Sequence, residues 1–80
     1  MAKVSDEETL YRLSYHLRQF RGTTSLSEIA RRAGTYPAAI KRIEDGESMP
    51  GVGLMTRVAK AVDRSVADFL APVKKTRKTA

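Results

Sequence analysis

Short apolar stretches with a helical period, three of them closed by a glycine, constrain the fold of this chain more than any other feature. The first stretch places Leu10, Leu13 and Leu17 at spacings of three and four, which is the pattern of one buried helix face. Because glycine readily takes the positive φ that turns a chain out of a helix, a glycine after such a stretch predicts its end. The stretches that end in this way predict helices over residues 6–21 before Gly22, 26–33 before Gly34, and from Pro37 to Gly46.

The starts of the helices carry their own signals. Ser5, Ser25 and Ser65 each precede an apolar stretch and are each followed three residues later by an acidic residue, which predicts three capping boxes. Pro37 suits a first helical position, since no backbone donor is needed there. Two further helices are expected, over residues 52–62 and from Val66 to Leu70. No segment alternates with period two, so we expect an all-α fold of five helices without a sheet.

The same periodicity selects the residues expected in the core, which are the apolar residues that share one face of each predicted helix. They are Leu10, Leu13, Leu17, Phe20, Leu26, Ile29, Ala30, Ala33, Ile40, Ile43, Leu54, Val58, Ala61, Val62, Val66, Phe69 and Leu70. A core of this size suits one small domain in a chain of 80 residues. We expect that domain over residues 1–71, and a basic, disordered tail over residues 72–80 after Pro72 stops the structure.

Positive charge is concentrated in two segments. Residues 9–43 hold seven basic residues against one acidic residue, a net charge of +6, and residues 71–80 add +4, whereas residues 44–70 carry −2. The whole chain has a net charge of +6 and a pI near 10.1, which favours nucleic acid as a partner over an anionic membrane surface. The tail lacks interleaved apolar residues and no apolar run can span a bilayer, so no membrane partner is expected.

Residue types that support catalysis or metal binding are scarce. The chain has no cysteine and a single histidine, His16, so neither a zinc site nor a serine–histidine–acid triad is expected. There is no phosphate-cradling glycine loop of the P-loop type. We therefore expect no enzymatic activity, no metal and no cofactor. The N-terminal segment lacks an apolar signal core, which favours a cytoplasmic protein. The nucleic-acid partner that the charge favours would place it at the nucleoid.

The two short helices on either side of Gly34 can form a helix-turn-helix. Ala30 permits a close approach, and Ile40 and Ile43 can pack the later helix back onto the earlier one. The wider segment from Ser25 to Leu70 resembles the Cro/C1-type, or xenobiotic-response-element, family of phage-repressor-like DNA-binding domains. The matching pieces are Ser25-Leu26, Glu28-Ile29-Ala30, Ala33-Gly34, Ile40, Ile43-Glu44-x-Gly46, Pro50, Val58-Ala59-Lys60-Ala61 and Ser65-Val66. The resemblance implies a five-helix, lambda-repressor-like fold.

The resemblance further implies that the helix starting at Pro37 lies in the major groove of double-stranded DNA. Arg42 is the preferred base reader, because a guanidinium can donate two hydrogen bonds to guanine, and a phosphate contact is its alternative. Lys41 favours a phosphate over a base. Ala38 either meets a thymine methyl or is an ordinary exposed residue. Tyr36, where the family has Ser or Thr, either touches a phosphate or packs on the domain edge. The base-contacting set is thus Tyr36, Pro37, Ala38, Lys41 and Arg42.

Other contacts that the resemblance implies involve the DNA backbone, the domain itself and a second copy. The phosphate-contacting residues would be Thr24, Ser25, Leu26, Ser48, Lys74 and Lys75. Glu44 would pair with an arginine late in the first helix, with Arg21 preferred to Arg18. The homodimer interface would come from the last helix through Val66, Phe69, Leu70 and Val73, and the alternative is the first helix with Tyr11 and Tyr15.

Taken with the charge, these features favour a sequence-specific transcriptional regulator, and repression over activation. It would bind an inverted-repeat operator as a dimer. The alternative function is that of an antitoxin, which would bind a partner toxin and regulate its own operon through the same DNA-binding surface.

Overall fold

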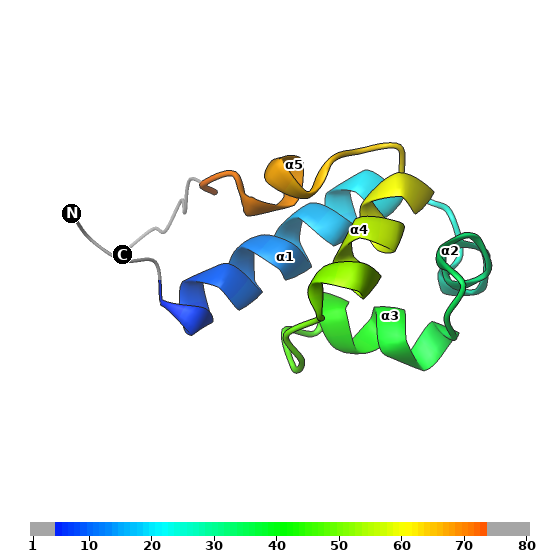
Figure 1. Ribbon diagram of the computed structural model, residues 1–80, viewed down its shortest axis with the longest axis horizontal. Helices are drawn as coiled ribbons and strands as arrows, with labels where there is room; N and C mark the ends of the chain where they lie inside the picture. The colour runs from blue at the N-terminus through cyan, green and yellow to red at the C-terminus, as the bar shows by residue number, and fades with distance from the viewer. Residues whose placement is uncertain (1–4, 74–80) are drawn as a thin grey trace.

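The structure, a computed structural model, describes residues 5–73, which form five helices around one core (Figure 1). The helices are α1 (Asp6–Arg21), α2 (Leu26–Ala33), α3 (Pro37–Glu44), α4 (Val52–Ala61) and α5 (Val66–Leu70). Residues 5–73 contain no strand, so the expected all-α fold of five helices is confirmed. None of these helices combines the length and the apolar character needed to cross a lipid bilayer. The predicted tail beyond Val73, with Lys74 and Lys75, lies outside the described residues.

All three serines that were expected to cap helices do so. The Oγ atoms of Ser5, Ser25 and Ser65 accept hydrogen bonds of 3.0, 3.0 and 3.2 Å from the backbone N–H three residues later. At α5 the box is reciprocal, because the Asp68 carboxylate accepts from the N–H of Ser65 at 3.0 Å. At α1 and α2 the prediction of a full box is wrong, since the acidic side chains there bond arginines of the following turn instead.

The helix ends follow the glycines closely. Gly34 ends α2 with a φ of +70°, and the next residue, Thr35, donates its N–H to the carbonyl of Ala30 at 2.9 Å. Gly46 takes a φ of +69° two residues after α3 ends, so that helix stops slightly before the predicted position. Both left-handed residues turn the chain sharply at places where a side chain would be strained.

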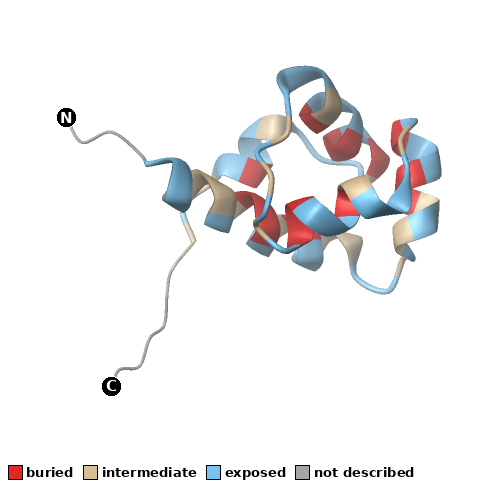
Figure 2. Cartoon of the chain, turned by 90° about the horizontal axis from the view of Figure 1, so that it is seen from below, coloured by how far each residue is buried: buried red, intermediate tan, exposed pale blue. Residues whose placement is uncertain are grey.

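The core lies between the helices, where the buried residues face one another (Figure 2). Its apolar members are Leu13, Leu17, Ile29, Ala30, Ala33, Ile40, Ile43, Met55, Val58, Ala59, Ala61 and Phe69. The periodicity predicted all of them except Met55 and Ala59, which widen the buried face of α4 because that helix packs on both α2 and α5. The expectation for Leu70 is wrong: it is 40% exposed, since Phe69 occupies the core side of the short α5.

Arginine side chains close the C-terminal ends of α2 to α5. The last carbonyls of a helix lack partners within it and carry partial negative charge, so a guanidinium both bonds and neutralises them. Each arginine comes from a helix other than the one it closes, and Arg12 and Arg18 both come from α1. The pairs are Arg57 with Ala33 (2.8 Å), Arg18 with Glu44 (2.7 Å), Arg32 with Ala61 (3.1 Å) and Arg12 with Leu70 (2.9 Å). Much of the positive charge of residues 9–43 therefore lies on side chains that bond other helices of the same domain.

Candidate nucleic-acid interface

The helix α3 has a buried side and an exposed side. Ile40 and Ile43 are 0% and 2% exposed and pack the helix against α1 and α2. Because successive residues turn by about 100°, Ala38 and Arg42 lie on the side opposite these isoleucines. The five residues predicted to contact bases are all exposed. They are Tyr36, Pro37, Ala38, Lys41 and Arg42. They form one continuous surface along α3 and its start.

The start of α3 lacks a side-chain cap. Tyr36 occupies the N-cap position in an extended conformation, is 57% exposed, and its side chain accepts no capping hydrogen bond. Pro37 follows as the first helical residue, where its missing N–H costs nothing. The positive end of the helix dipole is thus presented beside an exposed phenol, an arrangement that suits a nearby anion.

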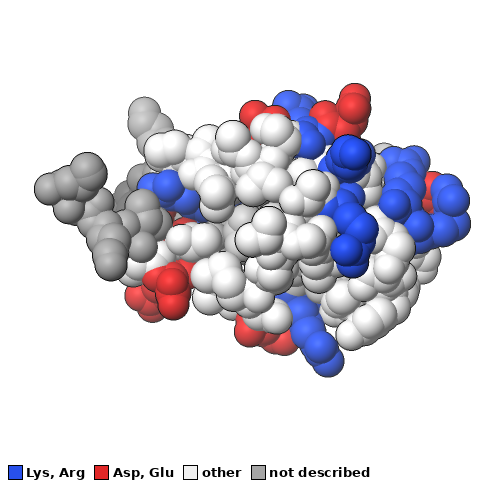
Figure 3. Space-filling model, viewed as in Figure 1, with Lys and Arg blue, Asp and Glu red and all other residues white. Residues whose placement is uncertain are grey.

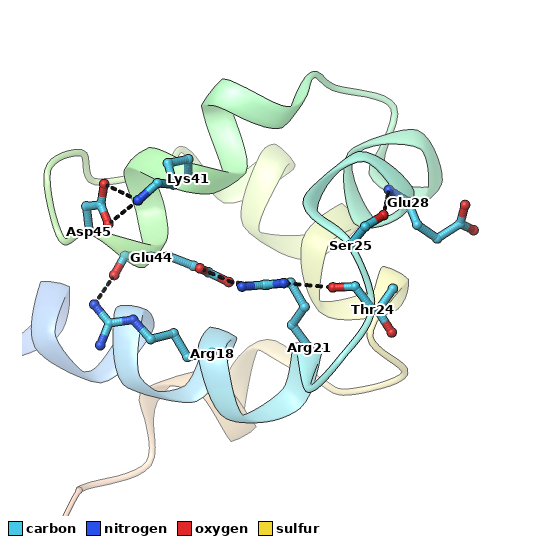
Figure 4. Close-up of polar contacts among 8 residues, drawn as sticks. All are labelled: Arg18, Arg21, Thr24, Ser25, Glu28, Lys41, Glu44 and Asp45. Atoms are coloured by element: carbon cyan, nitrogen blue, oxygen red, sulfur yellow. Dashed lines mark hydrogen bonds and ion pairs between the residues drawn. The ribbon is translucent and has the colours of Figure 1, made fainter.

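The end of α3 is anchored from behind by two arginines of α1 (Figure 4). Glu44 is only 5% exposed, and both its carboxylate oxygens accept from Arg21, through Nε and through Nη2 at 3.0 Å. This hydrogen bonding raises the pKa of Arg21. Arg21 also donates to the carbonyl of Thr24 at 2.7 Å, and Arg18 donates to the carbonyl of Glu44. The Arg21–Glu44 pair expected from the sequence is present, and Arg18 holds the backbone of the same residue.

The two cations of α3 differ in their surroundings. The ammonium group of Lys41 lies 3.1 Å from both carboxylate oxygens of Asp45, one turn further along. The guanidinium of Arg42 forms no hydrogen bond or ion pair with any other residue between 5 and 73. The five donors of its guanidinium are therefore available to an external partner. The sequence pattern did not distinguish these two neighbours in this way.

The residues predicted to meet phosphates surround the start of α2 and the loop after α3. Ser25 caps α2, while the side chain of Leu26 is half-buried against the core. Thr24 is half-buried directly before them, and its carbonyl is the one that Arg21 holds. Ser48 is half-buried in the α3–α4 loop. The start of α2 presents backbone N–H groups without intrahelical partners, as every helix start does.

Basic side chains also gather over α2 and the neighbouring part of α4 (Figure 3). Arg31, Arg32, Arg57 and Lys60 are exposed on these helices. Glu28 bonds Arg31 and Arg32, and these hydrogen bonds, with Arg31 first, lower the pKa of its carboxyl to about 2. Since Arg32 and Arg57 also cap helix ends, this cluster is in large part a structural one.

The residues predicted for a dimer interface divide into accessible and inaccessible ones. Phe69 is 0% exposed, so it has no surface to offer a second copy, and its assignment to the interface is wrong. Leu70 is 40% exposed, and Val66 and Val73 are half-buried. Tyr11 and Tyr15, the alternative on α1, are 37% and 38% exposed, with ring centroids 6.2 Å apart.

Side-chain contacts bring α1 and the end of α5 together into one surface. Arg12 donates to the carbonyl of Leu70 and His16 donates through Nε2 to the carbonyl of Ala71, both at 2.9 Å. Each donor is the immediate neighbour of one of the exposed tyrosines, Tyr11 and Tyr15. The two interfaces considered as alternatives are thus adjacent parts of the same face.

Comparison with solved structures identifies regulators of transcription with the same arrangement of helices. A hypothetical transcription factor, NHTF, from Neisseria aligns with a TM-score of 0.75 and 21% identity over 90% of this chain and 86% of its own. A repressor from a Salmonella-temperate phage gives 0.72 and 22% over 79% and 64%. The clp gene regulator ClgR from Corynebacterium glutamicum gives 0.65 and 29% over 82% and 69%. No family model and no curated protein sequence matches the chain.

Proposed function

Because the chain has the fold of the Cro/C1-type, phage-repressor-like helix-turn-helix domains, we propose that it is a sequence-specific transcriptional regulator with α3 as its recognition helix. The contrast between the two sides of α3 carries the proposal. One side is fixed to α1 through the Arg21–Glu44 pair, and the other exposes Arg42 without a partner in the described chain. A firmly held helix with an available guanidinium suits direct reading of base edges in a major groove.

Each exposed residue of α3 has a role in this proposal. Arg42 donates two hydrogen bonds to a guanine, and Ala38, on the same side of the helix, contacts a thymine methyl. Pro37 and Tyr36 lie at the start of the helix, the part that approaches the bases most closely, and the Tyr36 hydroxyl bonds a phosphate. Lys41 is the cation of the set whose chemistry suits a phosphate over a base, and in the free protein it is paired with Asp45.

The start of α2 and the loop after α3 contact the DNA backbone in the same proposal. The backbone N–H of Leu26 and the helix dipole favour an anion there. The Ser25 hydroxyl accepts from Glu28 N–H, which leaves its own proton free to be donated to a phosphate. Thr24 and Ser48 add hydroxyl donors on either side, and Lys74 and Lys75 add charge from outside the described residues.

Two copies are proposed to act together on an inverted repeat. One recognition helix reads only a few base pairs, so a pair of helices one DNA turn apart, about 34 Å, gives the required selectivity. The face shared by α1 and α5, with Tyr11, Tyr15 and Leu70 at its surface, supplies the contact. This face exposes few large apolar side chains, so we expect a weak dimer that is completed on DNA. Such occupancy of an operator acts by repression.

The experiment is a selection of bound duplexes from a random library with the purified full chain, followed by sedimentation of the complex with the selected site. We expect an enriched inverted repeat whose half-sites lie one helical turn apart, and two chains on each duplex. A library that emerges without enrichment contradicts sequence-specific binding. A saturated complex with one chain per full site contradicts the dimer alone.

A further inference from the structure

The ion pair between Lys41 and Asp45 is the one contact on the outer surface of α3 that the proposed function leaves unexplained. The ammonium nitrogen of Lys41 lies 3.1 Å from both Asp45 oxygens, and the two side chains are 58% and 34% exposed (Figure 4). The neighbouring Arg42 has no such partner within residues 5–73. The surface proposed to meet DNA therefore holds one available cation and one that is already paired.

Helix stability does not account for the carboxylate at position 45. Asp45 is the C-cap residue of α3, where the partial negative charge of the helix end repels an anion. The order of the pair, with Lys41 before Asp45, is also the less favourable one for an i,i+4 pair on a helix. The backbone N–H of Asp45 bonds the carbonyl of Lys41 at 2.9 Å whatever side chain the residue carries.

Position 45 lies on the surface proposed for DNA. With about 100° per residue, Asp45 follows Ala38 and Arg42 on the side of α3 opposite Ile40 and Ile43. A carboxylate there faces the same polyanion as Arg42. It also pairs with Lys41, the cation that a phosphate would otherwise bind. A cation that is already neutralised displaces no counterion from DNA, so it adds neither affinity nor salt dependence.

We propose that Asp45 is a specificity-determining residue that keeps Lys41 from the DNA phosphates. By lowering affinity for all sequences alike, it leaves discrimination to the residues that read bases, Arg42 above all. This inference rests on the proposed function, because it assigns the outer surface of α3 to DNA.

The test is a double-mutant cycle on the full chain, with Asp45→Asn, Lys41→Gln and the double variant. Affinity is measured against salt concentration on the selected duplex and on a scrambled one. With Asn at position 45, we expect tighter binding to both duplexes and a salt dependence steeper by about one phosphate contact, a slope change of about 0.9. Between 50 and 200 mM salt, that slope corresponds to an additional loss of about threefold. Lys41→Gln alone leaves the Asp45 carboxylate without its counter-charge, so it should not tighten binding to either duplex, and in the double variant it should remove the gain.

Glu47→Gln is the matched control. Glu47 is exposed two residues after Asp45 and forms no ion pair with any residue of the described chain. Its substitution removes the same charge from the same turn without releasing a cation, so the salt dependence should stay that of the wild type. Thermal unfolding of each variant establishes that the fold is intact.

Three outcomes overturn the proposal: an unchanged affinity for Asp45→Asn, a gain that survives in the double variant, or an equal gain for Glu47→Gln. The same four proteins can be compared by the salt concentration at which each elutes from immobilised heparin. This measurement needs no operator, so it separates this inference from the proposed function. If no duplex is selected but the cycle on heparin keeps its coupling, the function fails and the Asp45–Lys41 relationship holds. If a duplex is selected and either cycle shows no coupling, the inference alone fails.

Discussion

The Nε of Arg57, on α4, lies 2.8 Å from the carbonyl oxygen of Ala33, the last residue of α2. This contact closes the helix that precedes the turn into α3, so it supports the geometry of the helix-turn-helix from outside that motif. In the opposite direction, Arg32 of α2 donates to the carbonyl of Ala61, the last residue of α4, at 3.1 Å. The two helices thus cap each other, and their contact is polar as well as apolar.

Replacing Arg57 with Ala is expected to destabilise the fold by about 1 kcal/mol, because the carbonyl of Ala33 loses a charged donor in a partly buried place. Urea denaturation measures the change. Lys60→Ala is the control on the same helix, since Lys60 is exposed and its side chain forms no hydrogen bond or ion pair within the described chain. The control should stay within about 0.5 kcal/mol of the wild type. Equal effects of the two substitutions would show that the Arg57–Ala33 contact adds nothing.

Replacing Glu44 with Gln is expected to cost more, about 3 kcal/mol, because it leaves the partly buried guanidinium of Arg21 without its counter-charge. Denaturant unfolding gives the loss. A second variant, Arg21→Met with Glu44→Gln, removes both charges and should recover part of the stability. A loss of stability below about 1 kcal/mol for Glu44→Gln would show that the pair contributes no more than an ordinary surface ion pair.

Replacing Arg42 with Ala is expected to weaken binding to the selected operator by about 1–3 kcal/mol and binding to a scrambled duplex by much less. The reason is the proposed bidentate contact with one guanine, which a scrambled site does not offer in register. Titrations on both duplexes at one salt concentration measure the two losses, with Lys60→Ala as the control. Equal losses on both duplexes would make Arg42 a phosphate contact instead of a base reader.

Acidification is expected to weaken the cap of α5. The backbone hydrogen bond with Ser65 is the main cause that lowers the pKa of Asp68 below its ordinary value. A carboxyl whose pKa is lower in the folded state stabilises the fold above its unfolded pKa and loses that effect as the pH falls through the folded value. The stability difference between the wild type and Asp68→Asn should therefore shrink below about pH 4. A difference that stays constant down to strong acid would show that the ionised form plays no part.

The sequence predicted the helices well because their signals are local. Each boundary depends on a capping serine, a proline or a glycine a few residues away, and Gly34 takes the left-handed conformation that its position requires. The face of α4 was predicted too narrowly, since Met55 and Ala59 are buried by contacts that involve two neighbouring helices. A helix as short as α5 gives the periodicity too few residues, which explains why Leu70 was placed inward.

The candidate site was only partly predictable from the sequence, because some of its features depend on contacts between distant parts of the chain. The Arg21–Glu44 pair followed from the family resemblance, and the exposed face of α3 followed from its period. Composition could not tell which cations remain available to a ligand. Arg18 and Arg32 hold carbonyls 26 and 29 residues away along the chain, so their roles depend on the packed fold.

The arginine contacts at the helix ends couple the stability of one helix to that of another. Each contact joins helices that are far apart in sequence, and Arg12 reaches Leu70 across 58 residues. Opening α1 uncovers the ends of α3 and α5 at once, and opening either α2 or α4 uncovers the other. No helix that donates such a bond can fray alone without leaving a distant carbonyl unsatisfied. The amide hydrogens of α1, α2 and α4, the helices that donate these bonds, should consequently exchange with solvent through one shared opening.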